Sequence, residues 1–202
     1  MTVWLAPAPL VLASRSAARR ALLEAAGIPI ELHPADVDER ALEAEAMAHD
    51  PGTSASLLAR EKASVVAKSR PGRLVLGADQ ILALGPKRFS KPVDRSAARA
   101  QLKALRGRTH ELHAGLAFVE NGAVVFAHVE TARLTMRPFS DDFLDHYLDA
   151  MGDAVLASVG CYQLEGLGVQ LFERIDGDYF TILGLPLLQA LDFLRRRGYL
   201  AR

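Results

Sequence analysis

The stretch Leu10-Val-Leu-Ala-Ser-Arg-Ser-Ala-Ala-Arg-Arg-Ala-Leu-Leu23 predicts a buried strand, a polar turn and a helix in direct succession. The strand stops at the turn Ser14-Arg15-Ser16, and the helix that follows carries Arg19. Because a helix N-terminus presents free N–H groups and a partial positive charge, such a turn is suited to binding phosphate. Arginine adds planar donors that match phosphate oxygens. The simpler alternative is that Ser14 or Ser16 only caps the helix and that the arginines are solvated.

Size and composition predict a globular chain that folds over residues 1–202 as one domain or as two closely joined lobes. Half of the residues are hydrophobic, so the chain can bury a sizeable core. Acidic and basic residues balance at 24 each, which argues against a broad surface for nucleic acid or for an anionic membrane. We expect a cytoplasmic protein, because no apolar run approaches the roughly 20 residues that span a bilayer and the chain does not start with a basic secretion signal.

Hydrophobic patterns and turn signals predict helices intermixed with strands. Helices are expected at residues 15–26, from a Ser54 or Ser56 cap to a break at Arg70-Pro-Gly-Arg73, at 96–105, at 140–148, and from Pro186 to Gly198. Further strands are expected at 28–33, 74–79, 81–84, 109–119, 124–136 and 169–175. Asn121-Gly122, between two alternating runs, is a strong hairpin signal. Together these elements predict an α/β or α+β fold with a mixed, twisted sheet and flanking helices.

Asp79 is expected at the carboxyl end of the strand 74–79. An isolated carboxylate at such a position can take a proton from water or bind a hard cation through oxygen. Glu39, in the acidic segment Asp36-Val-Asp-Glu39, is a candidate second oxygen ligand for Mg²⁺. The alternatives are that Asp79 only caps a turn and that the acidic segment is solvated.

Lys62 and Lys91 are two of five lysines in a chain whose other basic residues are arginine. Ammonium groups neutralise a polyphosphate and its transition state, although each lysine alone can equally be a surface residue. The phosphate-binding loop Gly-x-x-x-x-Gly-Lys-Ser/Thr, the Gly-x-Ser-x-Gly elbow and the zinc motif His-Glu-x-x-His are all missing from the sequence. Cys161 is the only cysteine, which excludes an internal disulfide and a cysteine metal cluster.

Taken in order, these clusters resemble the Maf family of nucleoside triphosphate pyrophosphatases over nearly the whole chain. The matching motifs are Leu12-Ala-Ser-Arg-Ser-Ala-Ala-Arg-Arg-Ala-Leu-Leu23, Asp36-Val-Asp-Glu39, Leu58-Ala-Arg-Glu-Lys-Ala63, Leu76-Gly-Ala-Asp-Gln80, Lys91-Pro92, Arg106-Gly-Arg-Thr-His110 and Gly184-Leu-Pro186. The resemblance implies two lobes around a cleft, and hydrolysis of a nucleoside triphosphate to monophosphate and pyrophosphate with a divalent metal, Mg²⁺ or Mn²⁺. Members of the family often form homodimers, so a homodimer is one assembly that it implies.

The resemblance also implies roles for individual residues. The expected catalytic residues are Asp79, Lys62 and Glu39, with Asp79 and Glu39 as metal ligands. The expected substrate-binding residues are Ser14, Arg15, Ser16, Arg19, Lys91, Gln80 and Glu165. The chain departs from the common pattern at Ala17 and Ala18, where the family has proline and a bulky or basic residue, and at Ser90, which replaces a glycine.

Two segments resemble the branch of the family that acts on 7-methyl-GTP: Gly77-Ala-Asp-Gln80 and Leu164-Glu-Gly-Leu-Gly-Val-Gln-Leu-Phe-Glu-Arg174. The branch acting on dTTP and UTP usually has threonine and glutamine at the positions of Gln80 and Glu165. We hypothesise that Glu165 accepts hydrogen bonds from a guanine edge and favours the positive charge of the methylated base. The alternatives are a Glu165 paired with an arginine, a dTTP/UTP pyrophosphatase, and a nucleotide-binding regulator of cell division that does not turn over its ligand.

Overall fold

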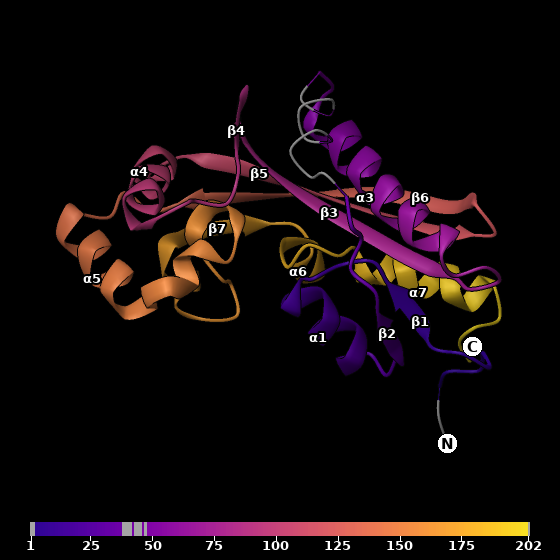
Figure 1. Ribbon diagram of the computed structural model, residues 1–202. Helices are drawn as coiled ribbons and strands as arrows, with labels where there is room; N and C mark the ends of the chain where they lie inside the picture. The colour runs from indigo at the N-terminus through magenta and orange to yellow at the C-terminus, as the bar shows by residue number, and fades with distance from the viewer. Residues whose placement is uncertain (1–2, 38–41, 43–45, 47, 202) are drawn as a thin grey trace. The chain divides into compact units, whose positions relative to one another are not determined.

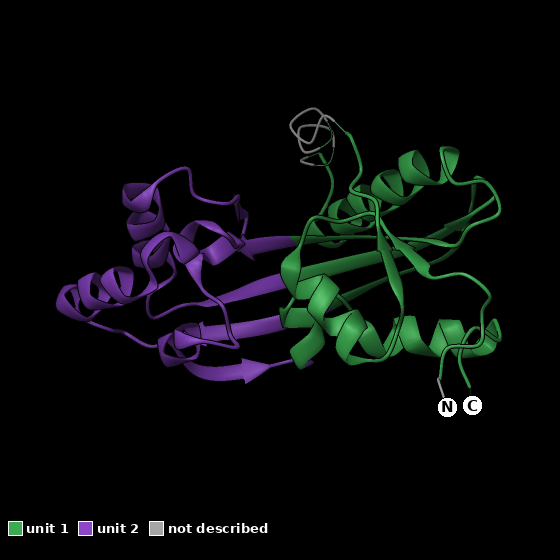
Figure 2. Cartoon of the chain, turned by 60° about the horizontal axis from the view of Figure 1, so that its bottom comes forward, with its two compact units in different colours: residues 1–80, 113–130, 179–202 green, residues 81–112, 131–178 purple. Residues whose placement is uncertain are grey.

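The structure, a computed structural model, describes residues 3–37, 42, 46 and 48–201 (Figure 1). It is a mixed α/β fold, as the sequence predicts. The chain divides into two compact units (Figure 2). Unit 1 comprises Met1–Gln80, His113–Glu130 and Tyr179–Arg202, and unit 2 comprises Ile81–Leu112 and Thr131–Asp178.

Seven strands of the described residues form one mixed sheet, in the order β2-β1-β3-β5-β6-β7 with β4 beside β3. Their bounds are β1 Leu10–Leu12, β2 Ile30–Leu32, β3 Val75–Leu84, β4 Lys87–Phe89, β5 Thr109–Glu120, β6 Ala123–Met136 and β7 Phe172–Asp176. Strand β1 pairs in parallel with β2 and with β3, whereas β4 runs antiparallel to β3 and β7 antiparallel to β6. Strands β3, β5 and β6 contribute residues to both units.

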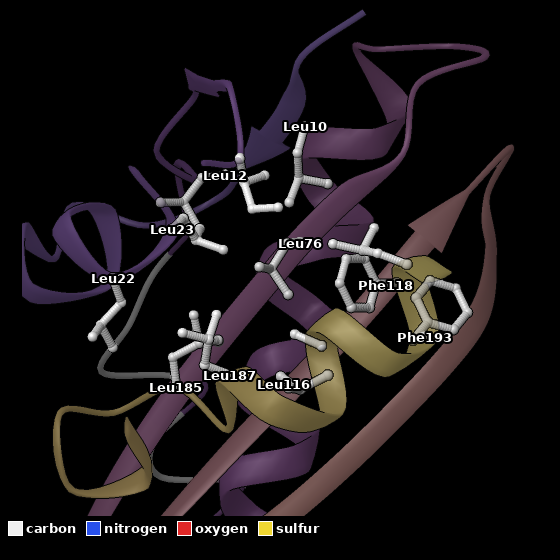
Figure 3. Packing of buried hydrophobic residues seen from close by; sticks show 14 of the residues in the cluster. Leu10, Leu12, Leu22, Leu23, Leu76, Leu116, Phe118, Leu185, Leu187 and Phe193 are labelled. Carbon is white, nitrogen blue, oxygen red and sulfur yellow. The ribbon is translucent and has the colours of Figure 1, made fainter. Parts of the chain in front are cut away.

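In unit 1, helices cover both faces of the sheet. The helices there whose bounds the structure describes are α1 (Ala17–Ala25), α3 (Pro51–Lys68), α6 (Tyr179–Ile182) and α7 (Leu187–Arg196). Because side chains alternate along a strand, Leu12 and Leu76 face α1 and α7, and they belong there to one buried cluster with Leu23 and Phe193 (Figure 3). Val11 and Val75, one residue out of step, pack with side chains of α3 such as Val66. The sheet is thus buried on both sides, which is the main source of its stability.

In unit 2, ion pairs join the two helices α4 (Arg95–Leu105) and α5 (Asp141–Met151). Three 3-10 helices follow α5 along the chain, at Gly152–Leu156, Val159–Cys161 and Leu167–Leu171. Arg99 of α4 donates to both carboxylate oxygens of Asp145 on α5, at 2.8 and 3.0 Å. Among the described residues, none of the helices is both long and apolar enough to cross a lipid bilayer.

Several local predictions are confirmed. Strands β5 and β6 meet at the predicted hairpin, where Asn121 and Gly122 have φ angles of 51° and 78°. Positive φ at both residues is the reason that this turn favours the Asn-Gly pair. Helix α1 is capped by Ser16 and is followed by Gly27 in a left-handed conformation, with φ of 74°.

Three element predictions are wrong. Residues 74–79 and 81–84 are not two strands, because the ten-residue strand β3 runs through Asp79 without a break. Helix α3 is capped by Asp50, which accepts from the N–H groups of Gly52 and Thr53 at 3.0 Å, and not by Ser54 or Ser56. Residues 167–171 form a 3-10 helix, so β7 starts only at Phe172. Strand β4 and helix α6 were not predicted.

Candidate active site

The candidate active site of unit 1 is centred on an ion pair between strand β3 and helix α3. The Lys62 Nζ atom donates to the Asp79 Oδ1 atom at 2.7 Å, and 14% of each side chain is exposed. Two charges at this depth are only partly hydrated, so their attraction is stronger than that of a fully exposed pair. The sequence prediction that Asp79 and Lys62 act together is therefore consistent with the structure, although Asp79 lies within a strand and not at its end.

Glycine at position 77 allows helix α3 to approach β3 closely enough for this contact. A Cβ atom built on Gly77 would lie 2.2 Å from the carbonyl oxygen of Ala59 and 2.8 Å from the nitrogen of Ala63. Residues 59, 62 and 63 share one face of the helix, and residues 77 and 79 share one face of the strand. The same close approach therefore places Lys62 beside Asp79.

A second glycine fixes the same helix against the neighbouring strand β5. A Cβ atom on Gly115 would lie 2.5 Å from the carbonyl oxygen of Ala55. Ala55, Ala59 and Ala63 are spaced four residues apart and are fully buried, so they form a narrow stripe of small side chains along α3. The main chain of α3 is thereby held against two adjacent strands.

The polar turn after β1 is closed by hydrogen bonds between its own residues. The Ser16 Oγ atom accepts from the Arg19 N–H group at 3.3 Å, as an N-cap does. The Ser14 Oγ atom accepts from the Ser16 N–H group at 3.2 Å and from the Arg19 Nη1 atom at 3.2 Å. Ser14 is 8% exposed, whereas Arg15 is exposed. Ser16 thus caps the helix, as the simpler alternative expects, but Arg19 is buried and not solvated. Phosphate binding by the turn stays a prediction.

Arg19 connects three of the sequence motifs. Its Nε atom donates to the carbonyl oxygen of Gly184 at 2.8 Å, and its Nη1 atom donates to that of Ala78 at 2.8 Å as well as to Ser14. The guanidinium group is buried, with 9% of the residue exposed. Arg19 therefore orients the turn, strand β3 and the segment before α7 relative to one another, a role that the sequence analysis missed.

Gln80 lies on the face of β3 opposite to Asp79. Its Nε2 atom donates to the carbonyl oxygens of Thr181 and Ile182 at 3.0 Å each. Gly184 approaches the same place with φ of 91°, and a Cβ atom there would lie 3.3 Å from the Arg19 Nη2 atom and 3.5 Å from the Gln80 Oε1 atom. A glycine just before Leu185-Pro186 is the sequence signal by which this approach could have been found.

The remaining candidate residues belong to unit 2 or lie outside the residues that the structure describes. Lys91 is an exposed residue of unit 2, in the loop between β4 and α4. Glu165 is also exposed and belongs to unit 2, in a turn where it forms no ion pair with another described residue. Its suggested pairing with an arginine is therefore wrong for the part of the chain that the structure describes. Glu39 lies outside the described residues.

The side chains of the site fit a metal ion that is bound partly by the protein and partly by the phosphates of a substrate. Across residues 3–37, 42, 46 and 48–201, no group of three or more His, Cys, Asp or Glu side chains could hold a metal ion. Asp79 supplies one carboxylate, which also accepts from Lys62. Mg²⁺ is commonly bound by one or two carboxylates together with substrate phosphates, so this set is compatible with a magnesium–polyphosphate complex.

Comparison with known proteins assigns the family. The sequence profile described as "Maf-like protein" matches residues 9–197. The chain is 58% identical, over the full length of both chains, to a protein of Rhodopseudomonas palustris strain HaA2 named nucleoside triphosphate pyrophosphatase. It is 52% identical, again over the full length of both, to a protein of the same name from Bradyrhizobium diazoefficiens. It is 51% identical to a Rhizobium etli protein named 7-methyl-GTP pyrophosphatase, over 94% of this chain and 96% of the other. The chain belongs to the Maf family.

Proposed function

We propose that this protein is a nucleoside triphosphate pyrophosphatase that uses a divalent cation and prefers 7-methyl-GTP. It would cleave the bond between the α- and β-phosphates and release pyrophosphate. The single observation that carries the proposal is the 2.7 Å contact between Lys62 and Asp79, which puts an acid and a cation at one place. Relatives of 51–58% identity that are named nucleoside triphosphate pyrophosphatase support the reaction class.

The chain's own residues divide the reaction into proton transfer and charge neutralisation. Asp79 lies within reach of Lys62, and we assign its carboxylate to accept the proton of the attacking water, through the oxygen that does not bind the cation. Lys62 itself would neutralise charge on the triphosphate as the pyrophosphate departs. A divalent cation bound at Asp79 would polarise a phosphate oxygen and the attacking water. Glu39 is the second ligand that we propose for it.

The turn after β1 is the proposed phosphate-binding element. Its Ser14-Arg15-Ser16 backbone precedes the N-terminus of α1, where the macrodipole favours an anion. Arg19 holds the turn in place through Ser14 and adds positive charge behind it. Lys91, from unit 2, is proposed as a further phosphate contact.

The preference for 7-methyl-GTP rests on two positions. Gln80 is held by the carbonyl oxygens of Thr181 and Ile182, which explains why an amide is suited to this position. Glu165 is exposed and carries a carboxylate that can accept two hydrogen bonds from a guanine edge and attract a positively charged base. The relative named 7-methyl-GTP pyrophosphatase supports this preference.

The reaction class is tested by measuring pyrophosphate release from 7-methyl-GTP, GTP, dTTP and UTP with Mg²⁺ or Mn²⁺. We expect Asp79→Asn to lower the rate by at least roughly 10²-fold, the low end for loss of a proton-transfer group. The matched control is Asp153→Asn at an exposed residue, which should leave the rate unchanged. Nucleotide binding without pyrophosphate release in the unmodified protein would instead favour the non-catalytic regulator.

The substrate preference is tested separately with Glu165→Gln. This substitution keeps the size of the side chain and removes its charge, so it should lower kcat/KM for 7-methyl-GTP more than that for UTP. Glu173→Gln, at an exposed residue of β7, is the control and should change neither value. If the unmodified protein hydrolysed UTP at least as fast as 7-methyl-GTP, the assignment of Glu165 would be abandoned. The hypothesis of a dTTP/UTP pyrophosphatase would then be adopted.

A further inference from the structure

The ion pair at the centre of the site occupies the carboxylate that a metal would need. The Lys62 ammonium lies 2.7 Å from Asp79 Oδ1, and only 14% of either side chain is exposed. A divalent cation that approached this carboxylate alone would meet a positive charge at hydrogen-bond distance from its ligand atom. At this depth that repulsion is weakly screened by solvent.

Lys62 can leave Asp79 only by moving its side chain. Helix α3 is fixed to β3 through Gly77 and to β5 through Gly115. At both glycines the backbone of the helix lies so close to the strand that there is no room for a Cβ atom. The main chain of Lys62 is therefore held in place. Its four-carbon side chain, in contrast, is flexible and ends in a compact charge with three donors.

A polyphosphate offers what both members of the pair would need after separation. Its oxygens can accept from the Lys62 ammonium, and they can complete the coordination of a cation that is bound to Asp79. The described residues supply no cluster of three metal-ligating side chains that would hold the cation without it.

We propose that Lys62 is an exchangeable counter-ion of Asp79: it pairs with the carboxylate in the free protein and transfers to a phosphate oxygen when the cation and the nucleotide bind together. The inference rests on the proposed function, since it concerns how the cation and the nucleotide bind at the same site. Cation and nucleotide binding are then positively coupled, and each must strengthen the other by the same factor. Lys62 is the residue that creates this coupling.

The test is binding of Mn²⁺ to the full-length protein, measured by electron paramagnetic resonance of the free ion, with and without a non-hydrolysable α,β-methylene nucleoside triphosphate. Without nucleotide, we expect Lys62→Met to bind Mn²⁺ at least roughly tenfold more tightly than the unmodified protein, within the usual range of coupling. The analogue should tighten Mn²⁺ binding to the unmodified protein by a similar factor and should tighten it much less in Lys62→Met. Lys68→Met, exposed at the end of the same helix, is the matched control and should behave like the unmodified protein.

Further variants keep the outcome decisive. Asp79→Asn combined with Lys62→Met should remove the gain in Mn²⁺ affinity, because that gain comes from the Asp79 carboxylate that Lys62 no longer neutralises. Lys62→Gln replaces Lys62→Met if the latter does not fold, and Lys62→Arg should keep Mn²⁺ binding weak. Equal Mn²⁺ affinity in the unmodified and uncharged variants would overturn the proposal even if pyrophosphate were still released. Conversely, a gain in Mn²⁺ affinity without any hydrolysis would leave the exchange standing and remove the proposed function.

Discussion

Gly77 on β3 and Ala59 on α3 are so close that a Cβ atom on the glycine would lie 2.2 Å from the carbonyl oxygen of the alanine. The clashing atom belongs to the main chain of a helix, so it cannot move away as a flexible side chain would. The contact that brings Lys62 to Asp79 therefore depends on a missing methyl group two residues before the acid.

Gly77→Ala should destabilise the protein by at least about 2 kcal/mol, because overpacking of a rigid interior displaces backbone. It should also lower activity in molecules that remain folded, since α3 must move away from β3. The free energy of unfolding is measured in urea by circular dichroism. Gly52→Ala in the first turn of the same helix is the control, because its nearest neighbour is the Asp50 side chain at 3.3 Å. Equal stability of the two variants would contradict this interpretation.

Arg19→Lys should lose both stability and activity although the positive charge is kept. Lysine cannot reproduce the planar group that reaches Gly184, Ala78 and Ser14 together. Leaving buried carbonyl oxygens without a donor costs about 1–3 kcal/mol for each group. Thermal denaturation and kcat are the measurements, and Arg20→Lys, on the exposed side of α1, should change neither. If Arg19 served only as a positive charge, the lysine variant would retain most of its activity.

The buried His110 should make the protein less stable in mild acid. Burial lowers the pKa of His110 to about 4, its Nε2 atom lies 2.8 Å from the Tyr162 hydroxyl, and its Nδ1 atom has no partner among the described residues. In the unfolded chain the pKa of His110 has its ordinary value of 6.5, so the unfolded chain binds the proton more readily. The contribution of the neutral, buried imidazole to the free energy of unfolding is therefore complete above pH 6.5 and is lost as the pH falls toward 4. Between pH 7 and pH 5 the loss is about 2 kcal/mol.

This prediction is checked by urea unfolding at pH 7 and at pH 5. In His110→Gln, which cannot titrate, the difference between the two pH values should shrink by about that amount. His146→Gln, at an exposed position of α5, should leave the difference unchanged. An equal pH dependence in all three proteins would show that His110 is not the group responsible.

Asp141 should contribute more to the stability of unit 2 than its neighbour Asp142. Hydrogen bonds from Lys103 and Arg106 lower the pKa of Asp141 to about 2, whereas the ion contact that the Asp142 carboxylate makes among the described residues is with His146, at 3.9 Å. Because its folded value is depressed, the contribution of Asp141 is present above pH 3.8 and is lost as the pH falls toward 2.

The measurement is the melting temperature of Asp141→Asn and of Asp142→Asn at pH 7. Both residues lie in the first turn of α5, so both variants lose a similar interaction with the helix dipole. The extra loss in Asp141→Asn should diminish in high salt, because these groups are exposed to solvent. Identical melting temperatures would argue that the α4–α5 ion pairs have no net effect.

The features predicted correctly from the sequence are those that depend on a few neighbouring residues. The Asn121-Gly122 turn and the Ser16 cap are satisfied within their own segments, so their residue types are sufficient to identify them. The cap of α3 was also a local signal, because Asp50-Pro51 is a common way to begin a helix, but the cap was predicted at Ser54 or Ser56.

Other features depend on contacts between distant segments. Strand β3 continues through Asp79 and Gln80 because each polar side chain finds a partner elsewhere in unit 1, Lys62 on one face and the carbonyl oxygens of Thr181 and Ile182 on the other. No local sequence pattern indicates those partners, so the strand was predicted to end at Asp79. The hydrogen bonds of Arg19 to Ser14, Ala78 and Gly184 were not predicted for the same reason.

The alternation of side chains along β3 also restricts how this segment can evolve. Inserting or deleting one residue between Gly77 and Asp79 would turn the amide toward α3 and the acid toward the carbonyl oxygens that now hold the amide. Mutation in this segment is therefore limited to the exchange of one residue type for another, and gains or losses of chain length have to occur in the loops.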